Sequence, residues 1–264
     1  APPREEDAQP VTSVNGVSIP SSLYERRLAL ALAYRVAAQG AGARGEMRQQ
    51  VLQQLIEEEL VRQLAQTRGV SLPDQVIDAQ VEALRAHYPD GLETWLADSG
   101  LELADLRAQI EGQLLRDALC TQVTQDLSRK AEQVQVTHIL VSQASLAEEI
   151  VSRLKGGESF AALAEQYSED PTTGAQGGDP GFLPRGIMPP AFDEAAFALP
   201  VGGTSDVVRS STGYHVIRVL AHEDQRPVDD ALWPAYRQQA CHTWLEEQLD
   251  QAQISVFLED VEGP

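Results

Sequence analysis

The chain has 264 residues, which is enough for one large domain or two smaller ones. Its 40 acidic side chains outnumber 20 basic ones, and a formal net charge of −20 repels nucleic acids and anionic lipids. No apolar run approaches the roughly 20 residues that span a bilayer. We therefore expect neither nucleic-acid binding nor an integral membrane segment.

The first ten residues are polar and proline-rich, so we expect a flexible tail over 1–10. The chain starts with Ala1 rather than with methionine. Such a start favours a mature form, from which a targeting segment has been removed.

Residues 11–130 form a mostly helical region in this interpretation. Residues 11–19 read as a strand or hairpin, because Asn15-Gly16 is a strong turn dipeptide. After it, apolar residues recur at helical spacing, with a glycine-rich break at 40–45. This spacing predicts helices over about 22–36, 47–64, 73–84, 92–96 and 103–127.

Two strands are predicted in the centre of the chain, and each contains a histidine. V-T-H-I-L-V over 136–141 includes His138, and S-T-G-Y-H-V-I-R-V over 211–219 includes His215. Both runs are rich in β-branched and apolar residues, which is typical of strands. If the strands are neighbours in a sheet, the two imidazoles can meet. Polar stretches at 128–133 and 222–227 mark the limits of this region.

The C-terminal part shows a helical pattern over 229–250 and a possible strand over 254–258. A lone helix and strand have nothing local to bury against, so we expect them to return to the N-terminal helices. The predicted lobe then combines 11–130 with 228–264, and a module over 134–222 is inserted in it. If the last helix returns in this way, Cys120 and Cys241 can pair; the alternative is two small buried side chains.

Further motifs give the module a family resemblance. F-A-A-L-A-E-Q-Y-S-E-D-P at 160–171 precedes the glycine-rich turn G-G-D-P-G-F at 177–182. With the two histidine strands, this order resembles a parvulin-type peptidyl-prolyl isomerase. The stretches 14–25 and 55–70 are similar to extracytoplasmic foldases of the SurA and PrsA type. The resemblance implies an α+β fold, in which a small, mainly antiparallel sheet surrounded by helices is inserted in a mostly helical chaperone lobe.

The resemblance also implies a site. It makes His138 and His215 a pair whose imidazoles share hydrogen bonds beneath the substrate, with Asp170, Ser210 and Thr212 as further catalytic positions. Met188 and Phe192 match the apolar socket for the proline ring. Pro180 stands where the family has a leucine and forms the third wall.

The implied activity is isomerisation of X-Pro bonds, with no cofactor and no metal. The implied partners are unfolded or partly folded polypeptide clients that contain proline, outside the cytoplasm in the periplasm or cell envelope. The loop at 142–145 has no cation that could select a phosphorylated substrate, so we expect phosphate independence. The spacing of the histidines and Asp170 does not favour a metal site.

The residues leave alternatives open. Each buried histidine can be structural, and Asp170 can be a turn residue in Glu169-Asp170-Pro171. The chain can accordingly be a non-enzymatic holdase with a degenerate parvulin module. A third possibility is an adaptor whose helical lobe docks one partner protein.

Overall fold

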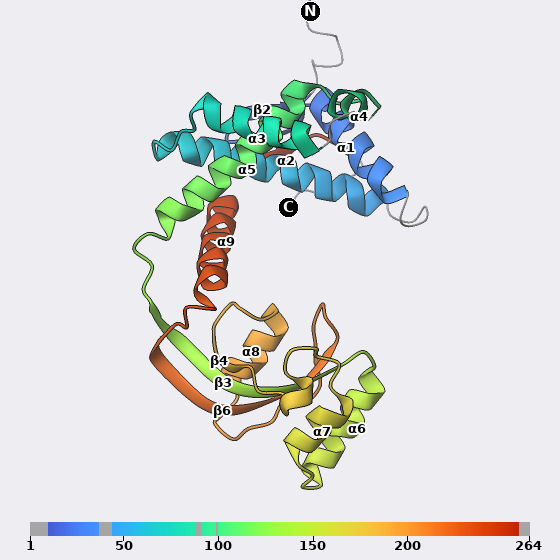
Figure 1. Ribbon diagram of the computed structural model, residues 1–264, viewed down its shortest axis with the longest axis vertical. Coiled ribbons are helices and arrows are strands. Elements are labelled where there is room, and N and C mark those ends of the chain that lie inside the picture. Colours follow the sequence, from blue (N-terminus) through green and yellow to red (C-terminus); the bar gives the residue numbers. More distant parts are fainter. Residues whose placement is uncertain (1–9, 37–43, 88–90, 99, 259–264) are drawn as a thin grey trace, which may run out of the picture. The chain divides into compact units, whose positions relative to one another are not determined.

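The computed structural model describes residues 10–36, 44–87, 91–98 and 100–258 (Figure 1). The described residues divide into two compact units. We call the first the lobe, which comprises the residues up to 125 and those from 244 onward, and the second the module, which comprises 126–243. The expected tail, apart from Pro10, lies outside the described residues, as does most of the break at 40–45.

The lobe contains a small antiparallel sheet made from both ends of the chain. Strands β1 (Pro10–Val14) and β2 (Val17–Pro20) form the expected hairpin. Its turn residues Asn15 and Gly16 have φ angles of 50° and 83°, the left-handed region that this dipeptide tolerates. Strand β7 (Ile254–Val256) pairs with the free edge of β1, so the strand order is β2-β1-β7.

Within the described residues, five helices follow the hairpin, at the places that the apolar spacing predicts. Helix α2 packs against both α1 and α5, and its buried apolar face joins the hairpin and the C-terminal strand in one core. The last helix ends at Val123, four residues earlier than expected, with Thr124 as its C-cap. The Thr124 hydroxyl donates to the carbonyl of Cys120. The helices are α1 (Ser21–Val36), α2 (Arg44–Thr67), α3 (Asp74–His87), α4 (Leu92–Asp98) and α5 (Leu103–Val123).

The module is built on a four-stranded antiparallel sheet with the order β4-β3-β6-β5. The two long central strands, which carry the histidines, pair along most of their length, so the condition under which the two imidazoles can meet is fulfilled. The elements are β3 (Lys130–Val141), α6 (Ala144–Lys155), α7 (Phe160–Tyr167), β4 (Gly181–Pro184), α8 (Pro190–Ala198), β5 (Val208–Arg209) and β6 (Tyr214–Pro227).

Helices cover the two faces of this sheet separately (Figure 1). Ile139 and Val141 of β3 point to the face covered by α6 and α7. Val136 of β3 and Ile217 of β6 point to the opposite face, which α8 covers. Because side chains alternate along a strand, His138 belongs to the α8 face.

The C-terminal helix α9 (Trp233–Gln251) is divided between the two units, whereas the sequence assigned all of 228–264 to the lobe. Its first half belongs to the module, because the guanidinium of Arg129 lies 4.4 Å from the ring centre of Trp233. Leu249 and the strand β7 pack in the lobe core. Cys120 and Cys241 are both disulfide-bonded, as the predicted pairing requires.

None of the described helices combines the length and the apolar character that crossing a membrane requires.

Candidate active site

Three aromatic rings meet on the α8 face of the sheet. In the register of β3 and β6, His138 lies opposite Ile217 and His215 lies opposite Leu140, so the two histidines are diagonal neighbours. Their rings stack with centroids 5.8 Å apart. The ring of Phe192, from α8, is nearly perpendicular to both, and its centroid lies 5.6 Å from that of His138 and 5.3 Å from that of His215. We call these three residues the ring cluster; each of them is buried.

On one side of the ring cluster, His138 is held by an acidic turn. Its Nε2 lies 3.0 Å from a carboxylate oxygen of Asp170 and 3.3 Å from the hydroxyl of Thr173. The Thr173 hydroxyl itself donates a hydrogen bond to Asp170. Thr173 was not among the residues expected at the site. Its signal is a threonine one helical turn after an aspartate, in Asp170-Pro171-Thr172-Thr173.

On the other side, His215 is held by two hydroxyls. Its Nε2 lies 2.7 Å from Ser210 Oγ and 3.1 Å from Thr212 Oγ1, and these two oxygens are 2.9 Å apart. The structure thus brings both hydroxyl residues to the histidine, as expected.

The expected sharing of hydrogen bonds between the two imidazoles is not found. Each ring uses its Nε2 in a network of its own, and neither Nδ1 has a hydrogen-bond partner among the described residues. The reason is geometric: the rings are stacked, with an interplanar angle of 28°, so their N–H groups do not point at each other.

Burial keeps both imidazoles neutral near pH 7. It lowers the pKa of His138, an effect that the nearby Asp170 carboxylate partly offsets. Burial, together with the neighbouring His138, lowers the pKa of His215 to about 4. For Asp170, partial burial favours the neutral acid, but hydrogen bonds from Thr173 and Thr172 outweigh it and lower its pKa to about 2. The site therefore contains one carboxylate charge beside two uncharged rings.

The glycine-rich turn packs closely against β3, the strand that carries His138, and is hydrogen-bonded to it. The backbone N–H of His138 donates to the carbonyl of Gly178 at 2.8 Å, and the Thr137 hydroxyl donates to the carbonyl of Gly177 at 2.8 Å. Gly178 has a φ of 83°, and a Cβ added there would lie 2.2 Å from the His138 carbonyl oxygen. Only glycine fits this contact.

The two expected socket residues besides Phe192, namely Met188 and Pro180, are both half-buried. Met188 is half-buried and packs in the same apolar cluster as Phe192. The turn before Met188 is fixed by Asp193, a buried residue that the sequence analysis did not select, whose carboxylate accepts from the backbone N–H of Gly186. Burial raises the pKa of Asp193 to about 6. Pro180 lies half-buried just before β4, and its part in the socket stays a prediction.

A group of side chains that could together hold a metal ion lies elsewhere in the module. Among the described residues, such atoms of Glu132, His222 and Asp224 fall within 4.8 Å of one another. The guanidinium of Arg185, however, already lies 2.9 Å from Glu132. This ion pair neutralises the negative charge of Glu132 that would attract a metal ion, and we assign no metal to the group.

The comparisons with known proteins divide the chain in a similar way. Residues 121–223 match the family described as the PPIC-type PPIase domain, and residues 3–120 match the SurA-like N-terminal domain. The foldase protein PrsA of Halalkalibacterium halodurans is 30% identical over 252 residues, which cover 81% of this chain and 71% of that protein. PrsA of Geobacillus sp. (strain WCH70) is 31% identical over 193 residues, which cover 70% and 69%.

Other relatives match a smaller share of their own length. Foldase protein PrsA 2 of Bacillus anthracis is 33% identical over 176 residues, and the match spans 65% of this chain and 62% of that protein. A solved structure of the PrsA peptidylprolyl isomerase from Bacillus anthracis has 28% identity and a TM-score of 0.47, covering 76% of this chain and 96% of that one. With its SurA-like N-terminal domain followed by a PPIC-type module, the chain belongs to the PrsA family of foldases.

Proposed function

We propose that this chain is a peptidyl-prolyl cis/trans isomerase that also binds unfolded polypeptides, and that it assists the folding of exported proteins. The observation that supports this proposal most strongly is the ring cluster, in which Phe192 closes over His138 and His215. The proposed clients are unfolded or partly folded chains that contain proline. The proposed location, outside the cytoplasm in the periplasm or cell envelope, rests on the same family resemblance.

Catalysis of this reaction requires a preference for a twisted amide. Rotation about an X-Pro bond has a barrier of roughly 18–20 kcal/mol, because conjugation between nitrogen and carbonyl is lost in the twisted state. In that state the carbonyl oxygen carries less negative charge than in the planar amide. An apolar, water-poor site with a carboxylate near this oxygen favours the twisted state. Each 1.4 kcal/mol of such preference accelerates rotation about tenfold.

In our proposal, each residue of the site has its own role in favouring the twisted amide. Phe192 and Met188 hold the proline ring, with Pro180 as the third wall. Asp170 supplies the carboxylate, which a pKa of about 2 keeps charged at any physiological pH. The neutral imidazoles of His138 and His215 form a rigid floor rather than acid and base groups, because isomerisation makes and breaks no covalent bond.

Two hydroxyls complete the proposed site. Ser210 and Thr212 fix the ring of His215 through its Nε2. The same oxygens lie in an exposed part of the chain and can also meet the client backbone.

The substrate is proposed to be unphosphorylated. A phosphate next to the proline needs an available Arg or Lys. Arg185 is already paired with Glu132 at 2.9 Å and stacks over Phe197. Arg209, at the short strand β5, is a single exposed arginine, and single arginines are common on protein surfaces without a phosphate partner. The nearest charge to the ring cluster is the Asp170 carboxylate, which repels a phosphate.

The alternative is a holdase whose module has lost catalysis. Pro180, which stands where the family has a leucine, motivates this alternative. Refolding of a denatured client whose slow phase is limited by proline isomerisation distinguishes the two. Uncatalysed isomerisation takes tens to hundreds of seconds. An isomerase accelerates this phase in proportion to its concentration, whereas a holdase reduces light scattering from aggregates and leaves the rate of the slow phase unchanged or lower. The second outcome, with no acceleration at any concentration, would exclude the isomerase.

A further inference from the structure

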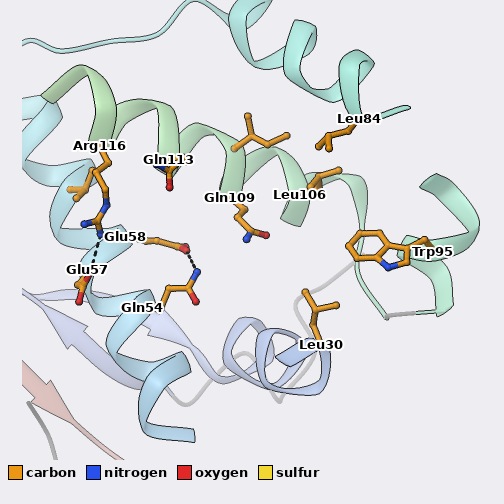
Figure 2. Close-up of a pocket in the computed structure, with 13 residues that line it drawn as sticks. Leu30, Gln54, Glu57, Glu58, Leu84, Trp95, Leu106, Gln109, Gln113 and Arg116 are labelled. Carbon is orange, nitrogen blue, oxygen red and sulfur yellow. Dashed lines mark hydrogen bonds and ion pairs between the residues drawn. The ribbon is translucent and has the colours of Figure 1, made fainter. Parts of the chain in front are cut away.

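The lobe contains a cavity of about 680 Å³ between α2 and α5, to which α1, α3 and α4 also contribute (Figure 2). Known ligand pockets have volumes of about 300–1,000 Å³. None of its lining residues belongs to the ring cluster or to the module. Its two ends differ in chemistry, and this difference indicates what it binds.

One end of the cavity is apolar. Leu30, Leu84, Trp95 and Ile110 line it, and all four are half-buried. The same four side chains pack on a small buried cluster made by α4 and α5. Figure 2 shows Trp95, Leu84 and Leu30 around this end. The cavity is thus the solvent-open flank of a hydrophobic core, and an apolar side chain of a ligand can complete it.

The other end of the cavity is charged and polar. Arg116 of α5 and Glu57 of α2 form an ion pair at 3.0 Å, and the amide of Gln54 donates to Glu58 at 2.9 Å. Figure 2 shows both interactions side by side, with Gln109 between them and the apolar end.

A second hollow, of about 540 Å³, continues from this polar end along α2. It shares Gln54 and Glu57 with the first cavity, so we treat the two as one lobe groove. The second hollow has no apolar lining residue; it is lined by Glu46, Gln49, Gln50, Gln53, Gln54 and Glu57.

The polar part of the lobe groove offers mostly hydrogen-bond acceptors. The amide nitrogens of Gln53 and Gln54 donate to Glu57 and Glu58, and that of Gln113 donates to Asp117. Each of these amides keeps its carbonyl oxygen as an acceptor and a second N–H as a donor. Glu57 is paired with Arg116, and Glu58 with Arg27 at 3.1 Å, but with Glu46 the carboxylates of the groove still outnumber these two arginines. Such a surface suits a ligand rich in donors, namely an extended backbone with its N–H groups and a Lys or Arg side chain. The chain's net charge of −20 also disfavours acidic segments.

We infer that the lobe groove binds an extended segment of unfolded polypeptide in which a large apolar side chain lies a few residues from a Lys or Arg. The spacing follows from α5. Leu106 at the apolar end and Arg116 at the polar end are separated by ten positions, or about 15 Å at 1.5 Å per residue. An extended chain covers this length in about four to five residues. The inference rests on the proposed function and names the sequence pattern that the lobe would recognise.

Gly112 provides a way to block the groove without disturbing the fold. It lies in α5 and lines the cavity, and an added Cβ would meet only Glu58 Cγ, at 3.8 Å. A leucine there extends into the cavity, and both alanine and leucine are better helix formers than glycine by about 0.5–1 kcal/mol. Gly112→Leu is therefore the blocking variant, and Gly112→Ala is its matched control.

The test is fluorescence anisotropy with a labelled, proline-free peptide of glycine and serine that carries one Phe and, four positions on, one Arg. Wild type and Gly112→Ala should bind it equally, and Gly112→Leu at least about tenfold more weakly, the loss of roughly one buried apolar side chain. A peptide with Ser for Phe should bind wild type about tenfold more weakly. A peptide with Glu for Arg should lose several-fold, and this difference should shrink at high salt.

Three results would overturn the inference: unchanged binding by a folded Gly112→Leu, equal binding of the Phe and Ser peptides, or equal binding of the Arg and Glu peptides. The two peptide comparisons use wild type and do not depend on the variant's stability. Light scattering of a denatured client distinguishes a failure of the groove assignment from a failure of the proposed function. A wild type without protection contradicts chaperone activity itself, whereas equal protection by wild type and Gly112→Leu contradicts only the assignment of the groove.

Discussion

Replacing Gly178 by alanine should loosen the strand that carries His138. An alanine at φ 83° costs about 1–2 kcal/mol, because its Cβ crowds the backbone. At this position the Cβ would also lie 2.2 Å from the His138 carbonyl oxygen, so the turn must move away from β3. That movement breaks the 2.8 Å hydrogen bond from His138 N–H to Gly178, worth about 0.5–1.5 kcal/mol. Overpacking adds about 1–3 kcal/mol.

Gly181→Ala is the matched control, since Gly181 also has a φ of 83° but has nothing within 4 Å of an added Cβ. The difference between the two variants should therefore be about 2–4 kcal/mol, or roughly 30- to 1,000-fold in the opening equilibrium. Hydrogen exchange of the peptide covering 134–141 in the full chain measures this opening. Exchange in Gly178→Ala within threefold of that in Gly181→Ala would refute the close-approach argument.

The site chemistry yields two further predictions. Folding lowers the pKa of His215 from 6.5 to about 4, so its stabilising effect is full above pH 6.5 and is lost as the pH falls towards 4. Over this range wild type should lose up to about 3 kcal/mol more than His215→Gln in pH-dependent urea unfolding, at about 1.4 kcal/mol for each unit of the pKa shift. Parallel curves would contradict this. Thr173→Val removes a buried donor to Asp170 and should lower isomerase kcat/KM about tenfold. Thr172→Val removes an exposed donor to the same carboxylate and should change kcat/KM little. Equal effects of the two variants in a peptide assay would refute the role of Thr173.

Both histidines could be assigned to strands from the sequence, and the family resemblance implied that their rings meet. Alternation along the strands could not show this by itself, because His138 and His215 share a face only in a register such as the observed pairing of Leu140 with His215. A slip of one residue would place the two rings on opposite faces. The helices of the lobe were predictable because their apolar spacing is regular, whereas the end of α5, which no glycine marks, lies four residues earlier than expected.

Other features depend on contacts that no local pattern encodes. Thr173 reaches Asp170 and His138 only because the turn after Pro171 curls back onto β3 through the hydrogen bond between His138 and Gly178. The stacking of the imidazoles depends on the register between β3 and β6. Helix α9 has one apolar stripe along its length, and this stripe does not reveal that Trp233 packs on Arg129 while Leu249 packs in the lobe.

The claim that the ring cluster is the active site of an isomerase is tested most directly by exchange NMR on a short Ala-Pro peptide. Wild type at catalytic concentration should produce exchange between the cis and trans signals, and Phe192→Ala should reduce the rate at least about tenfold. Phe160→Ala is the control, because Phe160 is also buried in the module but packs on the opposite face of the sheet. Exchange that is absent in wild type, or is equal in folded Phe192→Ala and Phe160→Ala, would contradict the account.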